Sequence, residues 1–356
     1  MIWQRQGVRG KLGWLALAPI SCGFSAIIRG RNKLYDRRWL SSTRQASLKV
    51  ISVGNLTVGG TGKTPTVLWL ARALAARGHK VGILTKGYKG DNTEITVVGT
   101  QGQPVATPDA VGDEAVMLAR LFPGVVIAGR DRGAGAKLAR DRFGLDIVIL
   151  DDGFQHRRLE RNVDLLLFHG RRDLSNRWLL PAGPFREPLS AAGRAHIVLV
   201  TKDESSGNES ARQRKWEAVR HHKPLYHGAL QPVALVSSEQ REWRELPLSE
   251  LNGKRIMALT GIADPASFYH SLQYWEVETA EILEFPDHHQ YSQADWHVIS
   301  AAGQKVDLIV TTEKDLVKLE RFPFATGKLV ALRVRLEIEH EESLLVDIER
   351  QLKKVK

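Results

Sequence analysis

The sequence predicts an α/β fold with a mostly parallel sheet flanked by helices, followed by a second, smaller α/β domain. From residue 48 onward, short apolar runs alternate with helical patterns, as they do in β-α-β units. These runs are continuous rather than alternating, which is typical of strands covered on both faces. After the polar, basic stretch 204–223 the pattern starts again, so we expect a domain boundary near residue 222. The expected divisions are an amino-terminal segment 1–45, a core domain 46–222 and a smaller domain 223–356 that closes over a cleft.

Residues 12–28 form an apolar run of 17 residues that contains Pro19. A membrane-spanning helix needs about 20 strongly apolar residues, so this run is too short. A signal peptide carries basic residues on one side only, whereas here they flank both sides. We therefore expect a helix that lies at an anionic membrane surface, inserted or interfacial. The alternative is a helix packed on the domain with solvated charges. The flanking bases are Arg5, Arg9 and Lys11 before the run and Arg29, Arg31, Lys33, Arg37 and Arg38 after it.

The core domain is expected to contain an exposed hairpin at 93–105 among regular strands and helices. The predicted strands cover 48–55, 80–87, 123–129, 145–153, 163–170 and 195–203, and the helices cover 64–78, 113–122 and 134–143. In the smaller domain the predicted strands cover 255–261, 276–285, 306–314 and 329–336, with helices near 264–274, 293–303 and 340–353.

Composition limits the class of protein. Of the 356 residues, 43% are hydrophobic and 26% charged, which excludes a disordered chain and a polytopic membrane protein. The single cysteine excludes an internal disulfide framework and a cysteine-cage zinc site. The net charge of +11 indicates an anionic partner, which could be nucleic acid, a phosphorylated substrate or an acidic lipid surface.

A glycine-rich loop follows the first strand of the core domain and precedes a helix. Its glycines allow the backbone to approach a polyphosphate, Lys63 can reach the terminal phosphates, and Thr64 can bind Mg²⁺. The standard pattern G-x-x-x-x-G-K-[ST] needs glycine at position 57, where Thr57 stands. The strand-loop-helix context still predicts a P-loop-like nucleotide site. Its expected residues are Thr57, Val58, Gly59, Gly60, Thr61, Gly62, Lys63 and Thr64.

Two acids, Asp151 and Asp152, follow the buried strand 145–150. A carboxylate at the end of a neighbouring strand can hold Mg²⁺ opposite Thr64. The alternative is a pair of acids that only ends a strand, and the sequence does not distinguish which of the two would contact the metal.

Two clusters are candidates to receive the proton of an acceptor hydroxyl. Asp113 and Glu114 begin a helix, where acids also serve as caps. Asp287, His288 and His289 are the second cluster, which could be a base, a metal ligand pair or a surface loop. A third stretch, 171–189, could meet phosphate and acyl chains, or be a solvated loop; its arginines are Arg171, Arg172, Arg177 and Arg186.

Together these stretches resemble the tetraacyldisaccharide 4'-kinase (lipid A 4'-kinase) family of Gram-negative bacteria over nearly the whole chain. The motifs are VGNLTVGGTGKTP, VGDEAVML, DDGFQHRRL, LLPAGPFREPL, TGIADPASF, FPDHHQYS and TTEKDLVKL. The variant loop that lacks the first glycine is itself similar to the family pattern.

The resemblance implies an ATP- and Mg²⁺-dependent kinase that phosphorylates the 4'-hydroxyl of tetraacyldisaccharide 1-phosphate, giving lipid IVA. It implies a monomeric, peripheral or monotopic protein on the cytoplasmic face of the inner membrane, with no nucleic-acid partner. Asp113 matches the catalytic base and His288 its partner, although His289 follows directly. Lys63 and Arg186 are the other catalytic matches, and Asp151 and Asp152 match the acidic strand end. Residues implied to shape the site are Glu114, Arg132, His156, Glu187 and His289.

Two alternatives remain open from the residues. One is a P-loop nucleotidase that acts as a regulatory or nucleic-acid-binding module, although the sequence shows no nucleic-acid-binding signature. The other is a metal-dependent hydrolase that uses the Asp and His clusters.

Overall fold

The computed structural model divides the chain into two compact units. The first contains Met1–Leu84, Asp131–Ala229 and Ile338–Lys356, and the second contains Thr85–Arg130 and Leu230–Glu337. The residues described are 7–45, 47–88, 90–91, 94–171, 174–201, 216–217, 219, 222–239, 242–324 and 327–354, with side chains from Trp14 onward.

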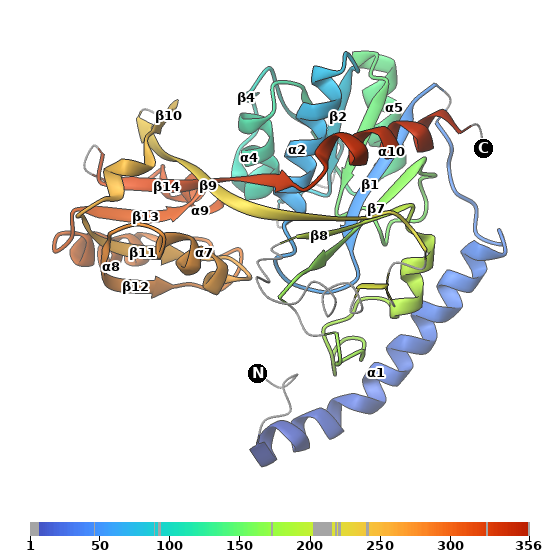
Figure 1. The fold of residues 1–356 in the computed structure, drawn as a ribbon, viewed down its shortest axis with the longest axis horizontal. Coiled ribbons are helices and arrows are strands. Elements are labelled where there is room, and N and C mark those ends of the chain that lie inside the picture. The colour runs from blue at the N-terminus through green and yellow to red at the C-terminus, as the bar shows by residue number, and fades with distance from the viewer. Residues whose placement is uncertain are drawn as a thin grey trace. The chain divides into compact units, whose positions relative to one another are not determined.

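The first unit is built on a parallel sheet (Figure 1). Its strands are β1 (Lys49–Asn55), β2 (Val81–Thr85), β6 (Ile147–Asp151), β7 (Val163–His169), β8 (Ile197–Thr201) and the start of β9 (Leu225–Glu239). Their order is β9-β8-β7-β1-β6-β2, and each neighbouring pair is parallel. Its helices are α1 (Gly7–Asp36), α2 (Lys63–Ala76), α5 (Arg132–Phe143), the 3-10 helix η2 (Leu189–Arg194) and α10 (Glu341–Lys353).

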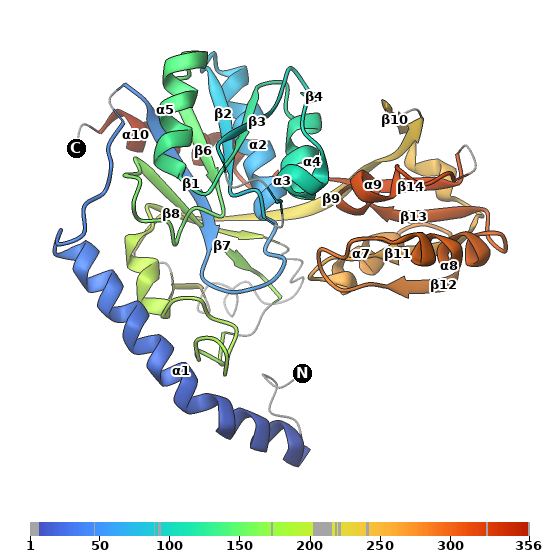
Figure 2. The same ribbon diagram turned by 180° about the vertical axis from the view of Figure 1, so that it is seen from behind.

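Helices cover both faces of this sheet, with α2 and α10 on one face and α5 on the other (Figures 1 and 2). The strands β1, β6, β7 and β8 are buried along nearly their whole length. This explains why they read as continuous apolar runs. A second apolar cluster, distinct from the residues buried along the strands of the sheet centre, includes Phe154, Phe185 and Trp216 and packs against Val198 and Val200 of β8.

The second unit contains two groups of strands. One is β12 (Glu278–Glu284), β11 (Arg255–Thr260), β13 (Leu308–Thr312), β14 (Leu329–Ile338) and the rest of β9, in that order, with β10 (Glu242–Leu246) antiparallel to β9. The other is β5 (Val125–Ala128), β3 (Thr96–Thr100) and β4 (Gln103–Pro104), which pair antiparallel. The helices are α3 (Pro108–Val111), α4 (Asp113–Leu121), the 3-10 helix η3 (Leu248–Leu251), α7 (Pro265–Leu272), α8 (Gln293–Gly303) and α9 (Glu313–Leu319).

The mixed α/β fold with a mostly parallel sheet is confirmed, and every predicted strand has a counterpart. The hairpin at 93–105 exists as β3 and β4, but it is not fully exposed, because Val98 is buried where β3 pairs with β5. The strands β9 and β10 and the helix α9 were not predicted from the sequence. Most of the polar stretch 204–223 lies outside the described residues.

The two compact units differ from the predicted continuous domains 46–222 and 223–356. Residues 85–130 pack within the second unit, because α4 lies against α9. The carboxyl-terminal helix α10 packs within the first unit, where Arg77 on α2 pairs with Glu342 and Glu349. Contiguous sequence patterns cannot reveal such exchanges, since each depends on contacts between residues far apart in the chain.

Helix α1 packs on the first unit along one face only. Trp14 contacts Trp178 edge to face, the Ser21 hydroxyl donates to the Leu179 carbonyl, and Phe24 and Ile28 pack on the second apolar cluster. Leu15, Ile20 and Ile27 of the same helix do not pack on the unit and are 59%, 61% and 70% exposed. Among the helices described, none has both the length and the hydropathy needed to cross a bilayer.

Candidate functional site

The glycine-rich loop leaves the carboxyl end of β1, the central strand of the first unit, and enters α2. Gly62 adopts φ 72° directly before α2, a conformation that favours glycine, and no side chain caps the helix. The Val58 amide donates to the Pro184 carbonyl, and the Thr201 hydroxyl donates to the Thr61 carbonyl. The loop is thus held from two sides, while the amino end of α2 is open to an anion.

A polar cluster lies beside this loop. Asn55, the last residue of β1, donates to the Thr61 hydroxyl and accepts from Lys63 and Arg186. Arg186 also binds both carboxylate oxygens of Asp152, at 2.8 and 2.9 Å, and Lys63 lies 3.6 Å from the same carboxylate. Desolvation raises the pKa of Asp152, but the charges of Lys63 and Arg186 outweigh it and hold that pKa well below its usual range. The cluster therefore keeps two cations and an anion together at the loop.

Arg132 lies behind this cluster. Its guanidinium is buried and donates to the carbonyls of Asp151 and Leu84. Burial lowers the pKa of Arg132 to about 10, although the charges of Asp151 and Asp152 act to raise it. The guanidinium is therefore still charged at neutral pH. Burial and the nearby Arg132 lower the pKa of His156 to about 4, so this imidazole is neutral.

Glu187 lies apart from the loop cluster, although it follows Arg186 in the chain. Its fully buried carboxylate accepts from Asn32 of α1 at 2.7 Å and from Arg194 at 3.0 and 3.1 Å. Burial raises its pKa, and the Arg194 charge with these bonds outweighs that and lowers it. Through its hydrogen bond from Asn32, Glu187 links α1 to the core of the first unit. Arg171 and Arg177 are exposed, and Arg172 lies outside the described residues; among the three described arginines of this stretch, Arg186 is the one found at the loop.

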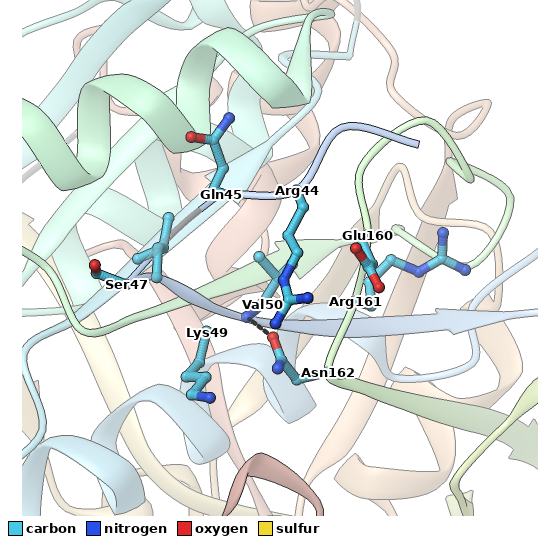
Figure 3. Close-up of a pocket in the computed structure, with 9 residues that line it drawn as sticks. Arg44, Gln45, Ser47, Lys49, Val50, Glu160, Arg161 and Asn162 are labelled. Atoms are coloured by element: carbon cyan, nitrogen blue, oxygen red, sulfur yellow. Dashed lines mark hydrogen bonds between the residues drawn. The ribbon is translucent and has the colours of Figure 1, made fainter. Parts of the chain in front are cut away.

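A pocket of about 390 Å³ lies at the opposite, amino end of β1 (Figure 3). Arg44, Lys49 and Asn162 are among the residues that line it. The Asn162 side chain accepts from the Val50 amide, and Arg161 is engaged by Asp164. Ligands of parallel α/β sheets bind at the carboxyl ends of the strands, so this pocket is not the nucleotide site.

In the second unit, the structure brings together Asp113 and His288, which are 175 residues apart. Their contact joins Asp113 Oδ1 to His288 Nδ1 at 3.2 Å. Asp113 is the first residue of α4, after Gly112 at φ 88°, where a Cβ would lie 2.3 Å from the Tyr88 carbonyl oxygen. The Tyr88 ring packs against the His288 imidazole with centroids 4.8 Å apart. An imidazole whose Nδ1 faces a carboxylate can accept a proton at Nε2.

Lys314 on α9 lies at the other side of His288. Its ammonium is 3.1 Å from His288 Nε2 and 3.1 Å from one oxygen each of Glu114 and Asp287. Glu114 and Asp287 therefore hold this lysine beside the imidazole. No role was predicted for Asn55, Lys314 or Lys318, although Asn55 lies in the motif VGNLTVGGTGKTP and both lysines lie in TTEKDLVKL.

The two adjacent histidines have different surroundings. His289 Nε2 contacts Asp295 at 3.1 Å, and its ring stacks on Phe285. Asp295 also completes the capping box of α8 with Ser292. The structure thus places His288 at Asp113 and His289 at the start of α8, a distinction that the sequence left open.

The described residues contain no cluster of three or more His, Cys, Asp or Glu side chains suited to hold a metal. Thr64 at the start of α2 and the carboxylates of Asp151 and Asp152 form an all-oxygen set of the kind that Mg²⁺ prefers. This set fits a metal that is completed by phosphate and water, and it does not fit a zinc site.

A parallel sheet with a glycine-rich loop at the carboxyl end of its central strand defines the class of α/β nucleotide-binding proteins. The family model described as "Tetraacyldisaccharide-1-P 4'-kinase" matches residues 13–353. The chain therefore belongs to the tetraacyldisaccharide-1-phosphate 4'-kinase family.

Individual relatives agree with this assignment. The tetraacyldisaccharide 4'-kinase of Syntrophus aciditrophicus is 40% identical and aligns with 88% of this chain and 86% of its own length. The tetraacyldisaccharide 4'-kinase of Anaeromyxobacter dehalogenans is 37% identical, and the match covers 90% of this chain and 85% of that protein. The crystal structure of LpxK from Aquifex aeolicus in complex with ATP has a TM-score of 0.78 and 32% identity, and the match covers 95% of this chain and 99% of that one.

Proposed function

We propose that this chain transfers the γ-phosphate of ATP to the 4'-hydroxyl of tetraacyldisaccharide 1-phosphate, forming lipid IVA in lipid A biosynthesis. Family membership carries the reaction and the acceptor. The structural observation that carries the proposal is the cluster of Lys63, Asp152 and Arg186 beside the open amino end of α2. Phosphoryl transfer depends mainly on such charge stabilisation and positioning. No observation favours the nucleic-acid-binding or hydrolase alternatives.

The first unit binds the nucleotide in this proposal. The backbone amides from Thr57 to Thr64 surround the phosphates, and Lys63 and Arg186 neutralise the charge on the terminal phosphate. Thr64 with Asp151 or Asp152 would hold Mg²⁺, which when bound would neutralise part of the charge on the transferred group. Asn55 positions Lys63 and Arg186 through its side-chain oxygen.

The second unit receives the proton of the acceptor. The substrate oxygen forms a bond to the γ-phosphorus while the bond from that phosphorus to the bridging oxygen breaks, and ADP leaves. The hydroxyl proton passes to the pair formed by Asp113 and His288. The Asp113 side chain is 4% exposed and both its oxygens face protein groups, whereas the His288 side chain is 13% exposed. We therefore assign the first contact with the hydroxyl to His288, with Asp113 holding the imidazole.

Helix α1 brings the enzyme to its lipid substrate on the cytoplasmic face of the inner membrane. Its outward face carries Leu15, Ile20 and Ile27, and Arg29 and Lys33 follow on its exposed side. Apolar burial together with attraction to anionic lipid suits a peripheral protein.

The proposal is tested by incubating the purified chain with ATP, Mg²⁺ and the disaccharide 1-phosphate lipid. We expect a mass gain of one phosphate, located at the 4' position by fragmentation in the mass spectrometer. Absence of transfer, with ATP hydrolysed to inorganic phosphate instead, would contradict the proposed kinase activity.

A further inference from the structure

A lysine on α9 is buried behind Asp113. The Lys318 side chain is 2% exposed and that of Asp113 is 4% exposed. The Lys318 ammonium lies 3.4 Å from Asp113 Oδ2 and 3.1 Å from Asp315 Oδ1. Burial of an ammonium costs free energy unless carboxylates balance its charge, and here the carboxylates of Asp113 and Asp315 do so.

Asp315 fixes where the lysine charge can be. Its carboxylate accepts from the Gly261 amide at 3.0 Å, the Thr312 hydroxyl at 2.8 Å and the Tyr291 hydroxyl at 3.1 Å. These neutral donors come from the ends of β11 and β13 and from the loop that carries His288. Asp315 is therefore rigid, and it fixes the position of Lys318 rather than depending on it.

The two oxygens of Asp113 then have separate environments. Oδ1 accepts from the Glu114 amide at 2.9 Å and faces His288 Nδ1 at 3.2 Å. Oδ2 is buried and faces only the Lys318 ammonium at ion-pair distance among the described groups. Rotation of the carboxylate would separate Oδ1 from the imidazole and Oδ2 from the Lys318 ammonium. Lys318 would then keep Asp315 as its carboxylate partner and lose Asp113. The ion pair with Lys318 therefore opposes that rotation.

We propose that Lys318, anchored by Asp315, is a positioning residue that keeps Asp113 ionised and its Oδ1 directed at His288. The inference rests on the proposed role of the Asp113–His288 pair. Lys318 touches neither substrate nor the reacting atoms, because it lies behind the carboxylate.

The electrostatic consequence has a definite sign. Burial raises the pKa of Asp113, but the His288 hydrogen bond and the charges of Lys314 and Lys318 outweigh it and hold the pKa well below its usual range. Loss of the Lys318 cation therefore raises the pKa of Asp113, because one of the charges that favour the ionised carboxylate is removed. The charged or titratable groups around Asp113 are Glu114, Asp287, His288, Tyr291, Lys314, Asp315 and Lys318.

The test measures kcat against pH, with saturating ATP and lipid, for the full chain and for Lys318→Met and Lys318→Gln. We expect the acid limb to move to higher pH by about one unit, the lower end of the effect of a charge at this distance. Activity is then recovered at alkaline pH, and the KM for ATP is unchanged. Lys318→Arg keeps the charge and is expected to restore the position of the limb.

Arg120→Met is the matched control. Arg120 is a largely buried cation on α4 that pairs with Glu320 next to α9, so its loss perturbs the same helix pair without touching Asp113. We expect a lower melting temperature and an unmoved acid limb. A pH-independent loss in Lys318→Met and Lys318→Gln would overturn the proposal, and so would failure of both to fold while Arg120→Met folds. Wild-type turnover in Asp113→Asn and His288→Gln would instead refute the proposed role of the pair itself.

Discussion

The loop cluster of the first unit and the Asp113–His288 cluster of the second unit are built on different principles. The backbone of the first comes from one continuous stretch, 54–64, which carries Asn55 and Lys63 and takes its shape from glycine conformations, and Asp152 and Arg186 join it. The second consists of side chains from Asp113, His288, Lys314 and Lys318, whose backbones are far apart in sequence. A backbone site is encoded locally, whereas a side-chain site depends on the tertiary structure. The two clusters should therefore respond differently to substitution.

The largest effect is expected for Asp113→Ala. Loss of the carboxylate removes the hydrogen bond that orients His288, and proton transfer by a positioned group contributes about 10²–10⁴-fold. We expect kcat to fall within that range, while ATP affinity measured by calorimetry is retained, because Asp113 belongs to the second unit. Asp109→Ala, an exposed acid on α3, is the control and should leave kcat unchanged. Normal turnover in Asp113→Ala would remove this residue from the chemistry.

Lys63→Ala should give the complementary result. Lys63 is the cation placed at the start of α2 by Asn55 and Asp152, and removal of one charge-stabilising donor costs about 10²–10³-fold. We expect kcat/KM for ATP to fall by that amount and ATP affinity to fall with it. Lys49→Ala, at the amino end of β1, should change neither kcat/KM for ATP nor ATP affinity. If Lys63→Ala bound ATP as tightly as the wild type, the two clusters would no longer differ in their effect on ATP affinity, and the assignment of the nucleotide to the loop would be wrong.

The same contrast explains what the sequence could predict. The loop 54–64 and the acids Asp151 and Asp152 were predictable because each lies at the carboxyl end of an apolar strand, and parallel strands end at one edge of a sheet. Asp113 and His288 were singled out as separate clusters, and only the family resemblance joined them. Lys318 and Asp315 lie in the motif TTEKDLVKL, but their burial beside Asp113 could not be predicted, since a charged residue on a short helix is ordinarily solvent-facing.

Local patterns also could not separate His288 from His289 or predict the exchange of segments between units. The choice between the histidines depends on the left-handed conformation of His288, at φ 58°, which directs the two rings to different neighbours. The placement of 85–130 depends on the packing of α4 against α9. Both are decided by contacts that no single stretch of sequence contains.

A smaller effect is expected from the outward face of α1, which belongs to neither cluster. Burial of one isoleucine contributes about 1.5–3 kcal/mol, so Ile20→Asp with Ile27→Asp should weaken binding to vesicles that contain anionic phospholipid by at least about tenfold. ATP affinity should not change, because both side chains point away from the core of the first unit. Val298→Asp alters an equally exposed apolar residue on α8 and serves as the control. Equal sedimentation of both variants with vesicles would refute membrane contact through this face.

The smallest effect is expected for His289→Asn, which compares two adjacent residues within the second unit. His289 contributes one contact to Asp295 and a ring stack on Phe285, so its loss should lower the free energy of unfolding by about 1 kcal/mol and change kcat by less than about twofold. His288→Asn, measured alongside, should lose most of its turnover because Asp113 then lacks its imidazole partner. If His289→Asn proved the more damaging for kcat at equal thermal stability, the assignment of the acceptor cluster to His288 would be wrong, and Asp295 would replace Asp113 as the candidate partner.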